Sequence, residues 1–253
     1  NRLFAAMPNM FGGSADLAPS NNTELKGTPF FSPEQREGCN IHFGVRELAM
    51  ACISNGIALY GGLRAFCATF FVFSDYIKPA LRLSALMKLP VTYICTHDSI
   101  GVGEDGPTHQ PIEQLAALRA TPNVYVFRPA DQKETAYSYL ASLKLSAPSV
   151  MALSRQNLPQ LADTSDKAML GGYILRDPKG TADVILMASG SEVELIYKAA
   201  DMLAVRGYTA RLVSIPCMEL FRSQSREYQE SVLPSDIRAR VSVEAGATQP
   251  WDA

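Results

Sequence analysis

The sequence predicts an α/β fold: a three-layer domain in which helices cover a parallel sheet, followed by a second, smaller α/β domain. Three observations support this prediction. Short β-prone apolar runs alternate with amphipathic helical runs along the chain. The connections between them are short, which favours parallel strands joined by crossovers. At 253 residues with 47% hydrophobic and 19% charged side chains, the chain can bury one large core or two ordinary ones.

The elements of the first domain follow one another in a regular order. Gly61 and Gly62 end the first amphipathic run, as helix C-termini often do. Pro111 stands at the tolerated first position of a helix, and Asp131 is the expected N-cap of another. The expected elements are helix 46–60, strand 65–71, helix 74–87, strand 90–95, helix 111–118, strand 124–127, helix 134–143 and strand 149–153.

Residues 155–170 lose periodicity and predict a linker, so we expect domains at 1–154 and 171–253. In the turn ASGSE, Ser191 is a candidate N-cap; the same turn is compatible with a phosphate at the helix start. Because the chain ends soon after its last strand, we expect an incomplete second domain. Its expected elements are strand 183–187, helix 193–206, strand 210–215 and strand 239–243.

Composition argues against several classes of function. A net charge of -2 and a pI near 6.0 give no basic field to attract nucleic acid or an anionic membrane. No stretch has the roughly 18 uninterrupted apolar residues of a membrane span, and no secretory leader is recognisable at the start. The five cysteines form no CxxC pair, so we expect buried free thiols in a reducing, cytosolic compartment.

The three histidines fall in two polar, glycine-containing segments that interrupt apolar runs. His42 lies in IHFGVREL, while His97 and His109 lie in THDSIGVGEDGPTHQP, straight after the expected strand 90–95. Ligands of parallel sheets collect beyond the carboxyl ends of the strands, so this loop is a candidate site. No third or fourth ligand stands at metal-binding spacing. Two loop histidines that donate protons or bind hydroxyl groups fit better.

Glu47 and three aromatic residues have both a functional and a purely structural interpretation. Glu47 lies in the first turn of the helix 46–60, where the helix dipole stabilises a carboxylate without any catalytic role. Phe70, Phe73 and Tyr76 are spaced three apart. They form either an ordinary core stripe or an aromatic shelf on which a flat ring stacks.

Further polar residues surround the same loop. Asp105 lies between the two loop histidines, so the loop can present two imidazoles and one carboxylate to a polar substrate. Arg155 follows the expected strand 149–153 and either binds a phosphate or is a solvated charge. Ser20, in SADLAPSN, also fits plain turn chemistry.

Taken together, four motifs closely resemble the pyrimidine-binding domain of the transketolase family. They occur in the family's order within residues 8–158: GGSADLAPSN at 12–21, IHFGVREL at 41–48, THDSIGVGEDGPTHQP at 96–111 and LSRQNL at 153–158. GSEVEL at 190–195 and VSVEAG at 241–246 extend the resemblance into the family's C-terminal domain.

The resemblance implies binding of thiamine diphosphate. Glu47 would hydrogen-bond the aminopyrimidine ring nitrogen, a contact that activates the cofactor. Phe70, Phe73 and Tyr76 would receive the pyrimidine ring, with Phe73 as the direct stacking partner, and Asp16 would lie close to the cofactor.

The resemblance also implies a sugar-phosphate substrate. Ser20, His97 and Arg155 would bind the phosphate, while Asp105 and His109 would bind hydroxyl groups nearer the reacting carbons. The implied reaction is the reversible transfer of a two-carbon ketol unit from xylulose 5-phosphate to ribose 5-phosphate in the pentose phosphate pathway.

Part of the family's site is missing from this sequence. Transketolases bind the diphosphate and Mg²⁺ or Ca²⁺ in an upstream domain through a Gly-Asp-Gly motif, which does not occur here. The family forms homodimers in which the cofactor lies between domains of two subunits, so we expect the isolated chain to be inactive. Two alternatives remain: another thiamine-dependent enzyme, such as deoxyxylulose-phosphate synthase or a 2-oxoacid dehydrogenase component, and a non-catalytic assembly or regulatory module.

Overall fold

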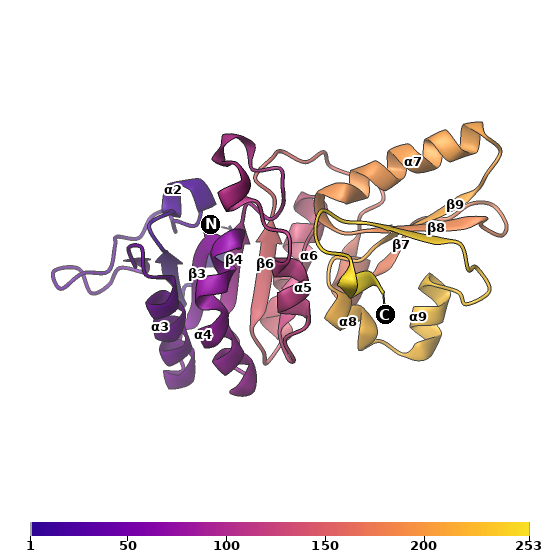
Figure 1. Cartoon of the computed structure of the whole chain (residues 1–253). Helices are drawn as coiled ribbons and strands as arrows, with labels where there is room; N and C mark the ends of the chain where they lie inside the picture. The colour runs from indigo at the N-terminus through magenta and orange to yellow at the C-terminus, as the bar shows by residue number, and fades with distance from the viewer. Residues whose placement is uncertain (1, 253) are drawn as a thin grey trace.

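Two β-sheets organise the chain, and helices pack against both faces of each (Figure 1). The structure is a computed structural model and describes residues 2–252. The first sheet has the strand order β2-β1-β3-β4-β6-β5, and the second has the order β10-β8-β9-β7. Within residues 2–252, no helix combines the length and the apolar character that crossing a membrane requires.

All six strands of the first sheet are parallel, so their carboxyl ends meet at one edge. Glycine allows the closest approach in this sheet, since a Cβ on Gly12 would lie 1.9 Å from the carbonyl oxygen of Phe66 on β3. The strands are β1 (Met10–Ser14), β2 (Asn40–His42), β3 (Arg64–Phe70), β4 (Thr92–Thr96), β5 (Tyr125–Phe127) and β6 (Ser149–Leu153).

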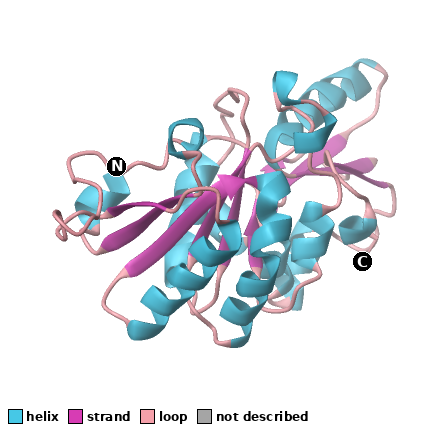
Figure 2. Ribbon diagram, turned by 60° about the vertical axis from the view of Figure 1, so that its left-hand side comes forward, coloured by secondary structure: helices cyan, strands magenta, loops and turns pink. Residues whose placement is uncertain are grey.

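Helices cover the two faces of this sheet as Figure 2 shows. On one face, α3, α4 and α5 bury apolar side chains such as Leu81 against Tyr93 and Val150. On the other face, α6 packs through Ala141 against Met151. The helices of this domain are α1 (Arg2–Ala6), α2 (Ala18–Asn21), α3 (Glu47–Tyr60), α4 (Ser74–Leu86), α5 (Gln114–Arg119) and α6 (Gln132–Lys144), with 3₁₀ turns η1 (Phe71–Phe73), η2 (Gly103–Asp105) and η3 (Pro107–His109).

The second sheet lies between α7 on one face and α8 with α9 on the other (Figure 1). Its strands β10, β8 and β9 are parallel, whereas β7 runs antiparallel to β9. The elements are η4 (Asp166–Leu170), β7 (Tyr173–Arg176), β8 (Val184–Ala188), η5 (Gly190–Glu192), α7 (Val193–Val205), β9 (Ala210–Ser214), α8 (Met218–Arg222), α9 (Arg226–Val232), β10 (Arg240–Val243) and η6 (Gln249–Trp251).

The predicted fold class is confirmed, and three local predictions are wrong. The helix expected from Pro111 begins at Gln114, because the Gln114 side chain accepts a hydrogen bond from the Ile112 amide and stabilises a bend there. Ser191 does not cap α7; it lies inside η5, and its hydroxyl donates to Glu192. Not all cysteines are buried, since Cys52 is exposed and Cys39 is partly exposed.

Asp131 caps α6 as predicted, because its carboxylate accepts a hydrogen bond from the Glu134 amide at 2.8 Å. Several elements had no clear signal in the sequence. They are the glycine-rich β1, the short β2, the antiparallel β7 and the helices α8 and α9.

Candidate active site

A cavity of about 540 Å³ opens at the carboxyl edge of the first sheet. Its walls come from the segments that follow β1, β2 and β3, together with η3 of the histidine loop. This is the edge at which parallel sheets bind ligands. The lining residues are Ala15, Asp16, Leu17, Val45, Glu47, Phe70, Phe73, Tyr76 and His109.

Three aromatic side chains form one wall of the cavity. The chain leaves β3 at Phe70, turns through η1 and enters α4, so residues spaced three apart face the same side. The rings of Phe70 and Phe73 are nearly parallel, with centroids 6.2 Å apart and 7° between their planes. Tyr76 continues the wall, 6.0 Å from Phe73. Phe71, on the same turn, is instead fully buried in the core.

Glu47 is the first residue of α3 and faces this aromatic wall across the cavity. It lies at the positive end of the helix dipole, which stabilises a carboxylate. The neighbouring Arg46 does not pair with it, because the Arg46 guanidinium donates to the carbonyl oxygen of Phe43. Within residues 2–252 the Glu47 carboxylate has no hydrogen-bond partner. It is therefore open to a ligand in the cavity.

The two loop histidines pack against the aromatic wall. The His97 ring stacks on Phe70, with centroids 3.7 Å apart and 28° between the planes. His109 meets Phe73 edge-on, at 5.4 Å and 76°. His97 has a backbone φ of 61°, which a residue with a side chain rarely adopts. His42 lies apart from the cavity lining, stacked on Phe30.

A chain of hydrogen bonds fixes the orientation of the His97 ring. The hydroxyl of Ser14 donates to the backbone carbonyl oxygen of Ala68, so the Ser14 oxygen accepts from the side-chain amide nitrogen Nδ2 of Asn21. The side-chain carbonyl oxygen Oδ1 of Asn21 then accepts from the Thr96 hydroxyl. With its only proton used, the Thr96 oxygen accepts from His97 Nδ1, 2.9 Å away. This chain assigns the proton of neutral His97 to Nδ1 and leaves Nε2 as an acceptor.

The charge state of His97 follows from its surroundings. Burial lowers the pKa of His97 below its ordinary value of 6.5, and the positive charge of Arg155 and the proximity of His109 lower it further, while Asp105 opposes them. The imidazole is therefore mostly neutral at pH 7.

The remaining predicted residues lie around the same loop. Asp105 is exposed in η2, close enough to His97 to influence its charge. The guanidinium of Arg155 lies against the loop at Gly103, where an added Cβ would be 3.4 Å from Arg155 Cζ. Asp16 lines the cavity, whereas Ser20 is exposed on α2 and lies outside the lining.

Asn21 and Thr96 are parts of the site that the sequence did not indicate. Each lies directly beside a predicted residue, Asn21 after Ser20 and Thr96 before His97. Asn21 lies in the motif at 12–21, and Thr96 lies in the motif at 96–111. The hydrogen bond that joins them spans 75 positions, so no local sequence pattern predicts it.

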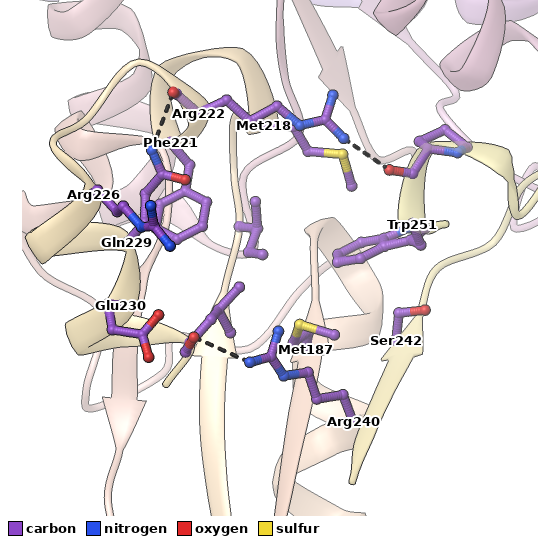
Figure 3. A pocket seen from close by; sticks show the side chains of 13 residues that line it. Met187, Met218, Phe221, Arg222, Arg226, Gln229, Glu230, Arg240, Ser242 and Trp251 are labelled. Atoms are coloured by element: carbon purple, nitrogen blue, oxygen red, sulfur yellow. Dashed lines mark hydrogen bonds between the residues drawn. The ribbon is translucent and has the colours of Figure 1, made fainter. Parts of the chain in front are cut away.

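A second cavity, of about 450 Å³, lies in the second domain between α8, α9 and β10 (Figure 3). Figure 3 shows Trp251 on one side, with Arg222 donating to a backbone carbonyl across the opening. The Arg240 guanidinium is likewise bound to carbonyl oxygens, those of Leu233 and Pro234. No histidine lines this cavity. Glu230 gives it a carboxylate, but it lacks an imidazole such as the one that His109 gives the first cavity.

In residues 2–252, no three or more His, Cys, Asp and Glu side chains gather in a way that would hold a metal ion.

Comparison with known proteins gives one consistent result. Residues 1–160 match the family described as the transketolase pyrimidine binding domain, and residues 171–253 match the transketolase-like C-terminal domain. The transketolase of Halalkalibacterium halodurans is 51% identical over 99% of this chain, but the chain spans only 38% of that protein.

Solved structures agree in fold. The chain matches the transketolase of Pichia stipitis in complex with sedoheptulose 7-phosphate with a TM-score of 0.94 and 47% identity, over 98% of this chain and 38% of that one. It also matches a split-gene transketolase described as an inactive β4 tetramer, with a TM-score of 0.74 and 26% identity, over 96% of this chain and 75% of that one.

Proposed function

Because this chain belongs to the transketolase family, we propose that it carries the pyrimidine-binding and sugar-binding half of a thiamine-diphosphate-dependent ketol transferase. One observation supports this most strongly. The carboxylate of Glu47, which has no hydrogen-bond partner within residues 2–252, shares one cavity with the half-buried Phe73 of the aromatic wall and with His109. A flat, nitrogen-containing ring needs both a stacking surface and a polar group at its edge, and this cavity offers both.

The residues fit one end of the cofactor. A volume of about 540 Å³ lies within the usual range of ligand sites, and Phe73 with Tyr76 supplies planar contact surface. Within residues 2–252, no cluster of His, Cys, Asp and Glu side chains would hold the Mg²⁺ or Ca²⁺ that accompanies the diphosphate. We therefore assign those groups to an upstream domain of the same chain or of a partner chain.

Each cavity residue then has a physical task. Thiamine diphosphate, when bound, supplies the electron sink that ketol transfer requires. Glu47 holds or shares a proton at the pyrimidine ring nitrogen, which a carboxylate in a partly dry site does readily. Phe70, Phe73 and Tyr76 position the ring, and Asp16 closes the cavity beside it. These residues mainly orient groups and exclude water.

For the substrate, we assign the phosphate to His97, Arg155 and Ser20, and the hydroxyl groups to Asp105 and His109. The contacts around the loop support this assignment: Arg155 lies against Gly103 and lowers the pKa of His97. An incoming phosphate dianion would favour the protonated imidazole and give it a partner at Nε2. We take xylulose 5-phosphate as the donor and ribose 5-phosphate as the acceptor, in the pentose phosphate pathway.

We propose a homodimer as the working assembly, with residues 1–154 as the pyrimidine-binding domain, 155–170 as the linker and 171–253 as part of the C-terminal domain. Large apolar side chains are exposed along α3 and α4 and just before α3, as expected of a covered surface. They are Val45, Leu48, Ile53, Leu59, Tyr76, Leu83 and Leu86. The split-gene relative described as inactive supports the expectation that this chain alone does not turn over. The cytosolic location stays a prediction.

Reconstitution tests the proposal. The 253-residue chain is mixed with a separately expressed diphosphate-binding domain, thiamine diphosphate and Mg²⁺, and supplied with ribose 5-phosphate and either xylulose 5-phosphate or pyruvate as donor. We expect turnover with xylulose 5-phosphate in the mixture and none with either chain alone. Turnover with pyruvate would instead identify a synthase of the deoxyxylulose-phosphate type. Failure of the full-length enzyme to bind the cofactor or turn over would leave a non-catalytic assembly module.

A further inference from the structure

Arg128 lies at the junction of the two domains and belongs structurally to both. It follows β5 of the first sheet, and its side chain is completely buried. Its backbone N–H donates to the carbonyl oxygen of Pro216, after β9 of the second sheet. Its own carbonyl oxygen accepts from the amide of Gly190. The backbone at this point therefore holds the edge of one sheet against the other.

The Arg128 guanidinium continues this connection with charged contacts in two directions. Toward the first domain, Nε donates to Asp98 Oδ2 at 2.8 Å. Toward the second, Nη1 donates to the Glu192 carboxylate and to the carbonyl oxygen of Ser189. Glu192 is itself held by the Ala245 amide at 3.0 Å. A planar, forked guanidinium carries five N–H donors in fixed directions, so it makes such contacts to two sides at once.

Gly190 fits tightly against this guanidinium. Its φ is +57°, and an added Cβ would lie 2.7 Å from Arg128 Cζ. The turn of the second domain therefore packs directly on the face of the Arg128 side chain and leaves it little room to move.

Asp98 connects this junction with the candidate site, because it follows His97 directly in the chain. Its side chain is 1% exposed, and in the described residues its second oxygen has no hydrogen-bond partner. Arg128 is thus the group that compensates this buried charge. A backbone φ of 61° at His97 is unfavourable and persists only where neighbouring contacts impose it. On one side of His97, the Thr96 hydroxyl bonds the His97 ring. On the other side, the adjoining Asp98 is held by Arg128.

We propose that Arg128 is a positioning residue through which the second domain fixes His97 at the phosphate end of the site. Glu192 anchors Arg128, Arg128 holds Asp98, and Asp98 fixes the backbone of His97. This inference rests on the proposed function for the identity of the ligand, a sugar phosphate. It gives the second domain, which contributes no residue to the cavity lining, a role in substrate affinity.

A second buried ion pair between the domains provides a matched control. Arg119 of α5 donates to both oxygens of Glu244, at 2.6 and 2.9 Å. This pair joins the same two domains and is equally buried. In the described residues Arg119 makes no hydrogen bond to Asp98 or His97, and its partner Glu244 is linked to Arg128 only through the Ser189 hydroxyl, which donates to Glu244 and accepts from Arg128 Nη1. Arg128→Gln and Arg119→Gln therefore remove the same kind of charge from the same junction, and only Arg128→Gln releases Asp98.

The test uses the full-length enzyme and donors with and without a phosphate, such as fructose 6-phosphate and fructose. For Arg128→Gln and Asp98→Ala, we expect KM for the phosphorylated donor to rise on the order of tenfold, with kcat and the values for the unphosphorylated donor nearly unchanged. Arg119→Gln should lower the Tm comparably and leave both KM values at wild-type level. Asp98→Asn, which keeps an oxygen for Arg128, should restore most of the affinity.

Hydrogen exchange gives a readout that is independent of turnover. Amides 97–106 should exchange faster in Arg128→Gln and Asp98→Ala than in wild type, and at the wild-type rate in Arg119→Gln. If Arg128→Gln does not fold, Asp98→Ala carries both measurements. Equal losses for both donors, or unchanged exchange at 97–106, would overturn the inference. Absence of any ketol transfer by the wild-type enzyme would instead refute the proposed function, and the exchange measurement would still decide the role of Arg128.

Discussion

Phe71 and Phe73 lie two residues apart on one 3₁₀ turn, yet the structure assigns them different roles. Phe71 is completely buried in the core under α3 and α4. Phe73 is half-buried and lines the cavity. Replacing each in turn by alanine therefore separates stability from cofactor binding, with nearly identical chemistry removed in both cases.

The expected magnitudes differ clearly. Removing a buried phenylalanine costs about 3–5 kcal/mol of unfolding free energy. At about 2–4 °C per kcal/mol for a chain of this size, Phe71→Ala should lower the Tm by roughly 6–20 °C. Phe73→Ala loses ring contacts worth about 0.5–1.5 kcal/mol for each of its pairs with Phe70 and His109, so its Tm should fall less than that of Phe71→Ala. Lost stacking of about 1–3 kcal/mol on a bound ring should weaken cofactor binding about 5- to 150-fold.

The assay is calorimetric titration of thiamine diphosphate, with saturating Mg²⁺, into the full-length enzyme, together with thermal unfolding of the same samples. Phe73→Tyr keeps the ring and serves as the control that should bind nearly as wild type does. The reasoning is refuted if Phe73→Ala binds thiamine diphosphate with wild-type affinity. It is equally refuted if Phe71→Ala, measured well below its Tm, shows the larger loss of affinity.

Two further predictions concern stability. Burial lowers the pKa of His97 below 6.5, so its contribution to stability is present above that pH and is lost as the pH falls through the folded-state pKa. Urea unfolding from pH 8 to pH 5 should therefore show wild type losing stability relative to His97→Asn. A constant difference between the two proteins would contradict this. Asp131→Ala removes the cap of α6 and the acceptor of a 2.7 Å hydrogen bond from the buried Thr164, so it should lower the free energy of unfolding by about 2–4 kcal/mol. Asp177 is exposed and paired with Arg211, so Asp177→Ala should lower the free energy of unfolding by less than about 1 kcal/mol. An equal loss for Asp131→Ala and Asp177→Ala would contradict this expectation.

The sequence predicted those parts of the fold whose signals are local. Asp131 predicts the start of α6 because an N-cap depends only on the next three residues. Gly61 predicts the end of α3 because a C-cap depends only on the last turn of the helix. The strand β1 has no such signal: Gly12 and Gly13 lie in it because β3 and β2 approach closely, a constraint set by residues far away in the chain. The strand β7 likewise has no local signal, because it forms by pairing with β9, which lies far from it in the chain.

The candidate site divides in the same way. Glu47, Phe73 and His109 were assigned to one site by the resemblance of their motifs to the transketolase family. The structure brings them to one cavity because each follows a strand of the same parallel sheet, and such strands end at one edge. Asn21 and Arg128 were not predicted. Their importance depends on partners 75 and 30 residues away, and no spacing rule joins those positions. Ser20 shows the reverse: it was selected from its motif, yet it is exposed outside the cavity lining.

In the proposed function, Glu47 interacts with the pyrimidine ring of bound thiamine diphosphate. The most direct measurement is the rate of hydrogen–deuterium exchange at the C2 position of the bound cofactor, followed by proton NMR in the full-length enzyme. We predict that Glu47→Ala slows this exchange by about 10²- to 10⁴-fold. Asp75→Ala, a carboxylate at the start of α4 outside the cavity lining, should exchange as wild type does. Exchange at the wild-type rate in Glu47→Ala would contradict the role proposed for Glu47.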